Sequence, residues 1–247
     1  MTGWSALVLA GSRPGGDPLA QAAGVSSKAL IGIGGSSMLA RVVGALRAAG
    51  AARIAVVASD PPVVALARDL GCETLPAQAG PSESAAAGFA LLGAPMLLTT
   101  ADHALLRPEW VTDFVTRQPA GIDVSVLLAR RPTIERDAPA TKRSYWHFAD
   151  GDWSGCNLFY LATPRAQAAL GLWRQVEADR KRPWRIVRKL GPALLARYLL
   201  GRLTLADGIA HLGRQAGLSA RAMESPFGLA AVDVDKPADL ELVRTLV

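Results

Sequence analysis

A glycine-rich loop with a single arginine follows the first apolar run of the chain. Residues 5–10 are typical of a buried strand, and the sequence GSRPGG at 11–16 comes directly after them. Glycine lets backbone N–H groups approach an anion closely, and Arg13 offers a planar fork for phosphate oxygens. Lys28 follows fifteen positions after Arg13. This pattern predicts a loop that wraps a triphosphate, with a lysine arriving later in the chain.

Two other phosphate-binding loops do not match this stretch. A Walker loop requires Lys-Ser or Lys-Thr after its last glycine, whereas Gly16 is followed by Asp17 and Pro18. In a dinucleotide fingerprint counted from Gly11, Arg13 stands where the second glycine belongs. The nearby prolines also disfavour immediate entry into a helix. Both alternatives are therefore rejected.

Asp102 follows an apolar run at 95–100 that is typical of a strand. A carboxylate at the ligand-binding edge of a sheet suits Mg²⁺, which prefers one or two carboxylates together with substrate phosphates. The alternative is an ordinary aspartate in a turn or at a helix N-cap. The adjacent His103 is not expected to act directly.

The elements that must position these residues alternate between strands and helices. Such alternation predicts a three-layer α/β/α fold with a mostly parallel sheet, and ligands bind such sheets at the carboxyl ends of the strands. The opening loop and Asp102 both fall at that edge, so we expect them to share one crevice. The expected strands are 5–10, 53–59, 95–100 and 123–129, and the expected helices are 36–50, 62–71, 82–93 and 108–118.

The pattern changes after about residue 130. Residues 141–162 resemble two aromatic-rich strands around an Asp-Gly turn, and 163–217 resemble several helices. Residues 229–247 are expected to form a strand, a turn and a final helix. We interpret residues 1–247 as one domain with an inserted hairpin and a helical, basic region at about 163–217.

The composition indicates a globular protein. Half of the residues are hydrophobic and 19% are charged, which is enough apolar material for a core. No apolar run approaches the ~18 residues that a membrane-spanning helix needs, and no signal peptide is recognisable. Cys72 and Cys156 form no CxxC motif, so a cytoplasmic, reducing setting fits best.

The positive charge is concentrated in one segment. The net charge is +6, and residues 180–189 alone carry six cations. Such a cluster can bind phosphate, nucleic acid or an anionic membrane, but no RNA-binding or zinc-finger motif accompanies it, so nucleic acid is not expected. The amphipathic stretch at 182–205 suggests peripheral contact with the inner face of a membrane. The alternatives are that these helices pack within the domain or pair two subunits as a homodimer.

Five segments, in this order, resemble one family of enzymes. They are LAGSR with KALIGIGGSSML near the start, GPSESAAAGFA at 80–90, LLTTADHALL at 97–106, GCNLF at 155–159 and DVDKPADLELV at 233–243. Together they are similar to nucleotidyltransferases with the molybdenum-cofactor nucleotidyltransferase-like fold, which is also a nucleotide-diphospho-sugar transferase-like fold. The gap between Arg13 and Lys28 is longer than is usual in that family.

The resemblance implies a reaction and a set of nucleotide contacts. Such enzymes transfer a nucleoside monophosphate from an NTP to a phosphorylated acceptor and release pyrophosphate, with Mg²⁺. Lys28 is then expected at the α-phosphate, Arg13 and the neighbouring amides at the β- and γ-phosphates, and Asp102 with Asp235 at the metal. The residues implied to bind nucleotide are Leu9, Ala10, Gly11, Ser12, Arg13, Gly15, Gly16, Lys28, Gly80, Pro81, Ser82, Ser84, Ala101 and Asp102.

Further residues are implied at the acceptor and near the metal. Asn157 resembles a position that contacts the acceptor, and Lys142 and Arg143, with Thr141 before them, could bind its phosphate. Asp235 could instead cap the helix that follows it, and Asp233 stands two residues earlier. Ser82 and Ser84 could equally be helix-capping serines. An ionised phosphate nucleophile needs no general base, so neither His103 nor Cys156 is expected to be catalytic.

The base and the acceptor stay open at this stage. CTP is marginally favoured as donor, and a lipid-precursor alcohol phosphate is one candidate acceptor. The alternatives are guanylyl or cytidylyl transfer to a pterin-type cofactor, and a non-catalytic nucleotide-binding regulatory module. A module of that kind would lack a pair of metal-binding aspartates.

Overall fold

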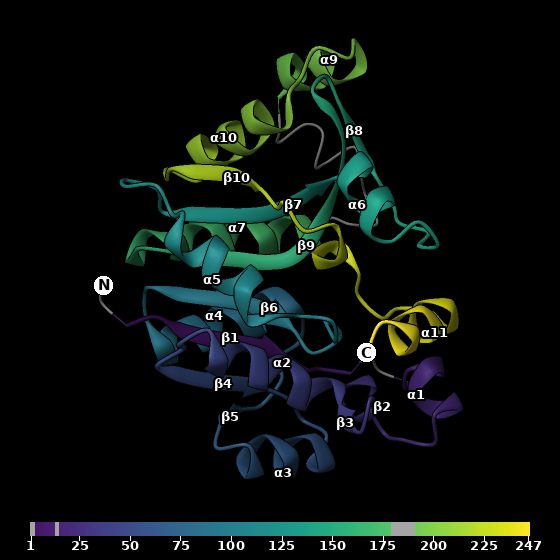
Figure 1. The fold of residues 1–247 in the computed structure, drawn as a ribbon. Coiled ribbons are helices and arrows are strands. Elements are labelled where there is room, and N and C mark those ends of the chain that lie inside the picture. Colours follow the sequence, from purple (N-terminus) through teal and green to yellow (C-terminus); the bar gives the residue numbers. More distant parts are fainter. Residues whose placement is uncertain (1–2, 13–14, 179–190) are drawn as a thin grey trace.

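The centre of the molecule is a twisted, mostly parallel sheet (Figure 1). The computed structural model describes residues 3–12, 15–178 and 191–247. Strand β1 (Ser5–Leu9) lies in the middle and pairs in parallel with β4 (Arg53–Val57) on one side and β6 (Met96–Thr100) on the other. Strand β5 (Glu73–Leu75) pairs in parallel with β4 at the edge. The carboxyl ends of these strands therefore meet along one edge of the sheet.

The other half of the sheet contains an antiparallel insertion. Strand β9 (Gly151–Leu161) runs antiparallel between β6 and β7 (Val124–Arg130), and the short β8 (Trp146–Phe148) pairs with its beginning. Strand β10 (Ala220–Glu224) pairs in parallel with β7 at the far edge. The predicted hairpin within 141–162 is thus confirmed as β8 and β9.

Helices cover both faces of the sheet, which confirms the three-layer α/β/α prediction. On one face α2 (Met38–Ala48) contacts α5 (Pro108–Thr116), and on the other α4 (Pro81–Leu92) contacts α7 (Gln167–Ala178). Each face has its own core: the larger one contains Val8, Leu46 and Phe114, and the smaller one Leu7 and Phe89. The other helices among the described residues are α1 (Pro18–Ala22), α3 (Pro61–Asp69), α6 (Arg131–Asp137), α9 (Pro192–Leu199), α10 (Leu205–Gln215) and α11 (Pro237–Thr245), with 3₁₀ turns η1 (Lys28–Leu30), η2 (Pro164–Ala166) and η3 (Gly228–Ala231).

The sequence signals explain where helices begin. The Ser37 hydroxyl accepts a hydrogen bond from the Ala40 N–H and so caps α2, while proline occupies the first turn of α1. Asp17 caps α1 by accepting from the Leu19 N–H at 2.8 Å. This short helix, which the sequence did not suggest, lies between the glycine loop and Lys28 and lengthens the connection between them.

The predicted strand at the start of 229–247 is wrong. The chain there forms the turn η3 and then an extended stretch that is not part of the sheet, because β10 already occupies the edge beside β7. Val232 and Val234 are fully buried, so the Val-Asp alternation reflects packing across the carboxyl edge of the sheet and not a β ladder. The short antiparallel pair of β2 (Gly32–Ile33) and β3 (Ser36–Ser37), with two residues in each strand, was also not expected.

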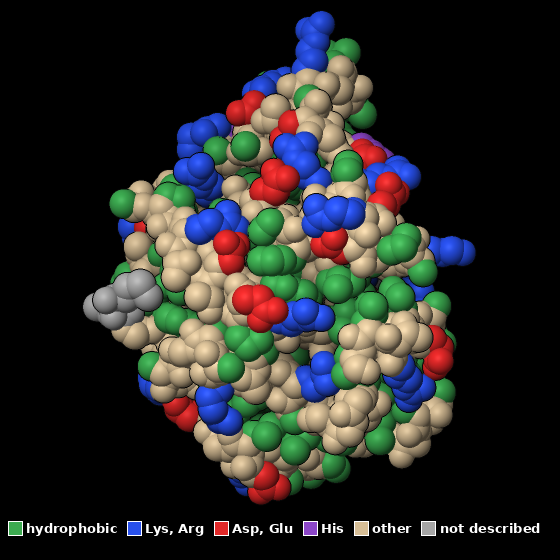
Figure 2. Space-filling model, viewed as in Figure 1, with side chains coloured by type: hydrophobic (Ala, Val, Ile, Leu, Met, Phe, Trp, Pro, Cys, Tyr) green, Lys and Arg blue, Asp and Glu red, His purple; other side chains and the backbone are tan. Residues whose placement is uncertain are grey.

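Within the described ranges, no helix has the length and apolar character needed to cross a bilayer. Figure 2 shows Lys and Arg side chains interspersed with Asp and Glu over the visible face.

Candidate active site

The side chain of Lys28 joins two aspartates that are far apart in sequence. Its Nζ donates to Asp102 Oδ2 at 3.0 Å and to Asp235 Oδ1 at 2.9 Å, and also to the Val234 carbonyl at 2.9 Å. The Lys28 and Asp102 side chains are about one-fifth exposed, whereas Asp235 is 55% exposed. The three groups therefore form one cluster that is open to solvent on the side of Asp235.

Backbone structure on three segments positions this cluster. Ser27 caps the 3₁₀ turn that begins at Lys28, with its hydroxyl accepting from the Ala29 N–H. Asp102 follows β6, and its carbonyl accepts a hydrogen bond from the Val234 N–H at 3.0 Å. The C-terminal segment is thereby attached to the carboxyl end of a central strand, which brings Asp235 beside Asp102.

Asp235 is not the cap of the final helix. The first turn of α11 is closed by Asp239, whose Oδ2 accepts from the backbone N–H groups of Asp235 and Lys236 at 3.1 and 2.9 Å. The Asp235 carboxylate is consequently directed to Lys28. The alternative capping role considered from the sequence is therefore filled by another residue.

The electrostatics of the cluster favour a charged lysine. Burial of the Lys28 ammonium would by itself lower its pKa, but the charges and hydrogen bonds of Asp102 and Asp235 outweigh burial, and the net effect raises the pKa above its ordinary value. Lys28 is thus a permanent cation at neutral pH, held at the position where two carboxylates converge.

The same carboxylates fit a divalent cation. Asp102 Oδ1 is buried and has no hydrogen-bond partner in the described part of the chain. This oxygen therefore keeps its lone pairs available for a ligand. In residues 3–12, 15–178 and 191–247, no group of three or more His, Cys, Asp or Glu side chains is arranged to hold a metal ion. Mg²⁺ needs only one or two carboxylates when substrate phosphates and water complete its shell. The pair Asp102 and Asp235 meets that requirement.

Asp233 belongs to a neighbouring buried network. Its two oxygens accept from Arg143 Nη1 at 2.5 Å and from Asn157 Nδ2 at 2.7 Å. Burial would raise the pKa of Asp233, but the bond from Arg143 overcomes it and lowers the pKa, so the carboxylate stays ionised. Asn157 reaches this position because its φ of 51° interrupts the regular alternation of β9. Arg143 and Asn157, both predicted at the acceptor, are therefore brought together by Asp233.

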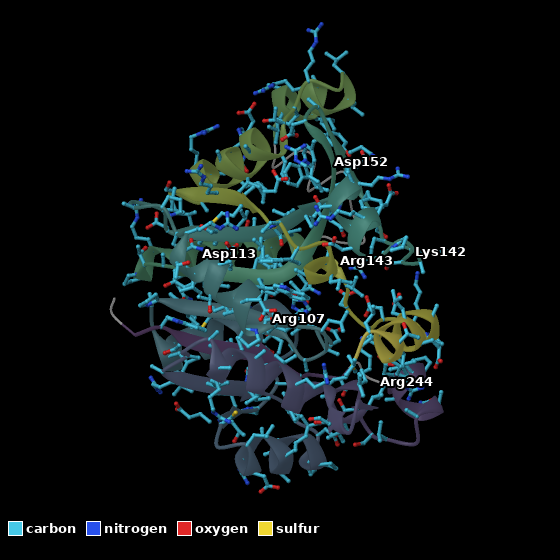
Figure 3. The ribbon with its side chains drawn as sticks, in the orientation of Figure 1. Arg107, Asp113, Lys142, Arg143, Asp152 and Arg244 are labelled. Carbon is cyan, nitrogen blue, oxygen red and sulfur yellow. The ribbon has the colours of Figure 1, made fainter. Side chains whose placement is uncertain are left out.

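Lys142 and Thr141 lie on the same loop but do not join that network. Figure 3 shows Arg143 beside the C-terminal segment and Lys142 further out on the loop before β8. Lys142 is exposed, and the Thr141 hydroxyl is buried without a hydrogen-bond partner in the described residues. Of the predicted acceptor residues, only Arg143 and Asn157 share a contact.

The opening loop lies at the same edge of the sheet. The Leu9 carbonyl accepts from the Ala101 N–H at 2.9 Å, so the loop and the Asp102 turn leave adjacent strands. Ser12 Oγ donates to Ser27 Oγ at 3.3 Å, which connects the loop to the turn that carries Lys28. Directly after β1, the Ala10 N–H donates to the Val57 carbonyl. Gly11 follows, and further along the loop Gly15 and Gly16 have φ angles of 91° and 84°. Arg13 lies outside the described residues.

The segment GPSES begins helix α4. Gly80 is the N-cap and Pro81 the first helical residue, so Ser82 and Ser84 are buried inside the first turn and neither is the cap. The Ser84 hydroxyl accepts from the Gln78 N–H at 3.0 Å. The capping role considered for these serines is thus wrong in detail, although both stabilise this end of the helix.

Glu177 is a residue of this region that the sequence did not indicate. Its Oε2 accepts from the Ser82 hydroxyl and, at 3.2 Å, from the Ser82 N–H, and a Cβ at Gly80 would lie 2.6 Å from its Oε1. A carboxylate at a helix N-terminus is electrostatically favourable. Only the packing of α7 against α4 brings these residues together, and no local pattern signals that contact.

His103 and Cys156 are both buried. Burial lowers the pKa of His103 to about 4, so its ring is neutral at physiological pH. Burial also raises the pKa of the Cys156 thiol, which disfavours the thiolate form.

Comparison with known proteins identifies the family of this chain. Residues 6–225 match the model of the MobA-like NTP transferase domain. The chain belongs to this family. It is thus a member of the nucleotidyltransferases, as the five segments of the sequence had suggested. No curated protein matches the chain in sequence.

Several solved structures are similar in fold to this MobA-like domain. A hypothetical transferase from Thermus thermophilus is 33% identical, with a TM-score of 0.84, over 97% of this chain and 100% of that one. CMP:2-keto-3-deoxy-manno-octonic acid synthetase, complexed with CTP, is 17% identical, with a TM-score of 0.61, over 99% and 98% of the two chains. A nucleotidyl transferase from Methanothermobacter thermautotrophicus is 15% identical, with a TM-score of 0.61, over 100% and 98%.

Proposed function

We propose that this protein transfers a nucleoside monophosphate from an NTP to a phosphorylated small-molecule acceptor and releases pyrophosphate. The single observation that carries the proposal is the meeting of Lys28 with Asp102 and Asp235 at the carboxyl edge of the sheet. A regulatory module that only bound nucleotide would need no such pair of carboxylates around a lysine. The family match supports the same reaction class.

The reaction places two anions in contact, so the chain must supply positive charge and alignment. A phosphate oxygen of the acceptor attacks the α-phosphorus, a new P–O bond forms, and the bond to pyrophosphate breaks in line with it. Lys28 would neutralise the α-phosphate, and the backbone N–H groups of the glycine loop, with Arg13, would hold the β- and γ-phosphates. No general base is required because the nucleophile is already ionised.

Asp102 and Asp235 would hold Mg²⁺ between them. When bound, such an ion neutralises phosphate charge and orients the reacting phosphates. Because Lys28 now bonds to both carboxylates, its ammonium would have to release at least one of them to reach the nucleotide. The lysine and the carboxylate pair are therefore proposed to act as one unit.

Arg143 and Asn157 are the proposed acceptor contacts. The Arg143 guanidinium bonds to Asp233 through one nitrogen, and its buried Nε has no hydrogen-bond partner in the described residues. A guanidinium held in this way can present its remaining N–H groups to a phosphate. Exposed Lys142 would add charge at the entrance, and Gly80, Pro81, Ser82 and Ser84 would line the nucleotide base.

The identities of the donor and the acceptor are also part of the proposal. CTP is the first candidate donor, as in the complex of the synthetase with a similar fold. A lipid-precursor alcohol phosphate is the first candidate acceptor. We also propose that residues 1–247 act as one domain, that the enzyme works in the cytoplasm and that its 180–205 region contacts a membrane. Of that region the structure describes only residues from 191 onward.

Calorimetric titration of CTP, GTP, ATP and UTP, each with and without Mg²⁺, tests the proposal first. We expect one nucleotide to bind tightly only with Mg²⁺, and Lys28→Met to weaken that binding at least tenfold. Pyrophosphate release with that nucleotide and a panel of phosphorylated alcohols, sugars and pterins then identifies the acceptor. Failure of all four nucleotides to bind, alone or with these acceptors present, would overturn the proposal.

A further inference from the structure

Glu177 brings a carboxylate from the last turn of α7 to the start of α4. The side chain is half-buried, and its Oε2 accepts from both the hydroxyl and the N–H of Ser82. Among the hydrogen bonds within the described residues, none reaches the other oxygen, Oε1. The carboxylate therefore has one oxygen engaged and one that can accept from a further donor.

A glycine leaves space beside that second oxygen. A Cβ at Gly80 would lie 2.6 Å from Glu177 Oε1, so a side chain at this position would displace the carboxylate. The φ of Gly80 is −153°, which is extended backbone that any residue adopts. The backbone thus does not require a glycine here, whereas the position of the carboxylate does.

Helix α7 is held against the sheet and against α4, so Glu177 has a fixed support. Arg174, one turn before it, bonds to Glu83 of α4 at 2.9 Å. Trp173 stacks on Phe159 of β9 with ring centroids 6.5 Å apart, and Leu170 is buried in the smaller core. Figure 1 shows α7 and α4 on the same face of the sheet. A side chain held in this way loses little conformational entropy when it binds a ligand.

The segment that leads into α4 borders the glycine loop. A Cβ at Gly11 would lie 3.7 Å from the Ala77 Cβ, and the Ala77 N–H donates to Ser59 Oγ, just after β4, at 3.0 Å. The start of α4 and the loop proposed to hold the triphosphate therefore lie at the same edge of the sheet. A nucleotide with its phosphates on that loop has this segment within reach of its base.

The two serines at the start of α4 are already engaged. Ser82 is 2% exposed and Ser84 5% exposed. The Ser82 hydroxyl donates to Glu177, and the Ser84 hydroxyl accepts from the Gln78 N–H. Of these three side chains at the proposed base subsite, Glu177 is the one that keeps an oxygen for a ligand.

We propose that Glu177 determines which base the nucleotide carries, by accepting a hydrogen bond at Oε1 from an exocyclic amino group. An ionised carboxylate accepts hydrogen bonds and donates none. Cytosine, adenine and guanine each carry an amino group, whereas uracil has a carbonyl in its place, which the carboxylate would repel. A site built to bond a donor rejects analogues that lack it. The inference rests on the proposed nucleotidyl transfer and narrows its donor to an amino-bearing base.

Calorimetric titration with Mg²⁺ tests the inference on matched nucleotides. CTP is compared with UTP, and ATP and GTP with ITP, whose base carries no amino group. We expect the native chain to bind the amino-bearing nucleotide at least about tenfold more tightly than its counterpart. Glu177→Gln keeps the shape of the side chain but can present an N–H to a carbonyl, so this ratio should fall by about tenfold or more.

Glu83→Gln is the matched control. It removes the neighbouring carboxylate and its bond to Arg174 but leaves Glu177 in place, so the ratio should stay at its native value. If Glu83→Gln lowers the ratio as much as Glu177→Gln does, the packing of α7 on α4 sets the preference and the inference is overturned. Urea unfolding of both variants checks that they are folded.

The comparison on the native chain needs no variant and separates this inference from the proposed function. If nucleotides bind but UTP or ITP binds as tightly as its amino-bearing counterpart, the role of Glu177 is overturned and nucleotidyl transfer stands. An unchanged ratio in folded Glu177→Gln leads to the same conclusion. If none of the five nucleotides binds, alone or with the acceptor panel present, both proposals fail together.

Discussion

Lys28 connects the parts of the candidate site at the scale of single residues. Its ammonium contacts carboxylates that are 74 and 207 positions away in the chain. Removing either carboxylate leaves the lysine one charged partner and the Val234 carbonyl, so the fold should tolerate the loss. Loss of either carboxylate should therefore affect the rate of the reaction more than the free energy of unfolding.

Asp102→Asn and Asp235→Asn test the carboxylate pair. Each variant keeps the shape of the side chain but removes a charge from the proposed Mg²⁺ site. We expect pyrophosphate release to fall by about a hundredfold or more, while the free energy of unfolding changes by less than about 1 kcal/mol. Steady-state kinetics and urea unfolding measure the two quantities.

Asp113→Asn is the control for these variants. Asp113 forms an ion pair with Arg117 on the surface of α5, away from Lys28, and Figure 3 labels it. Its loss should change neither quantity appreciably. If Asp113→Asn reduces turnover as much as the two site variants, the assigned roles of Asp102 and Asp235 are wrong.

His103 gives the protein a predictable response to acid. Burial lowers the pKa of its folded form from 6.5 to about 4. Between these two values the unfolded chain binds a proton that the folded chain does not, so stability falls as the pH falls. This one group should cost on the order of 3 kcal/mol over that window.

Urea unfolding at a series of pH values measures this effect. His103→Gln lacks the titrating ring, so its unfolding free energy should fall less steeply between pH 6.5 and about 4 than that of the native protein. The Asp233 carboxylate does not affect this comparison. Because its pKa is lowered in the folded protein, its protonation destabilises the protein only at pH values below this window. Identical slopes in the two proteins would contradict a buried neutral histidine.

At the scale of elements, η3 determines where the C-terminal segment crosses the sheet. Gly228 lies against α6, and its N–H donates to Asp137 Oδ2 at 2.7 Å. A Cβ at Gly228 would lie 2.2 Å from the Thr133 carbonyl oxygen, which is backbone and cannot move aside easily. The contact between α6 and η3 thus fixes the start of the path to Asp233 and Asp235.

Gly228→Ala is predicted to destabilise the protein by about 1–3 kcal/mol and to reduce pyrophosphate release by displacing the 232–235 segment. Gly44→Ala is the matched control. Gly44 lies inside α2, and a Cβ there meets nothing within 4 Å. That substitution should stabilise the helix by roughly 0.5–1 kcal/mol. Differential scanning calorimetry compares the two, and equal effects would contradict the role of the α6 contact.

Local patterns predicted most elements but not how they contact each other. Apolar runs identified β1, β4, β6 and β7, and the parallel pairing of β1 with β6 placed the glycine loop beside Asp102. The sequence could not decide whether Asp235 binds metal or caps the final helix. The capping role is filled by Asp239, whose carboxylate accepts from the Asp235 N–H, and no local pattern signals that contact. The contact of Glu177 with Ser82 was missed for the same reason: it exists only through the packing of α7 on α4.

At the scale of the whole molecule, a ligand that binds the folded chain alone raises its stability by mass action. A nucleotide at a concentration 100 times its dissociation constant adds about 2.7 kcal/mol. For a chain of this size that corresponds to a rise in Tm of roughly 5–11 °C.

A thermal-shift assay checks this prediction. The rise should require both Mg²⁺ and the nucleotide identified by calorimetry, and it should be much smaller for Asp102→Asn. Leu199→Ser with Leu200→Ser should show the full rise, because those residues lie on α9 and not in the site. A full rise in Asp102→Asn would contradict the proposed metal position.

The hydrogen bond from Val234 to the Asp102 carbonyl has a consequence for how the molecule is divided. The match to the family ends at residue 225, whereas the second carboxylate on Lys28 belongs to residue 235. Two halves of one charge cluster thus lie on opposite sides of that border. A chimera that kept residues 6–225 of this chain and took its remaining residues from a relative would exchange half of the cluster along with the tail. Swapping tails among relatives would therefore replace one of the two residues whose carboxylates contact Lys28, while the shared transferase core stayed the same.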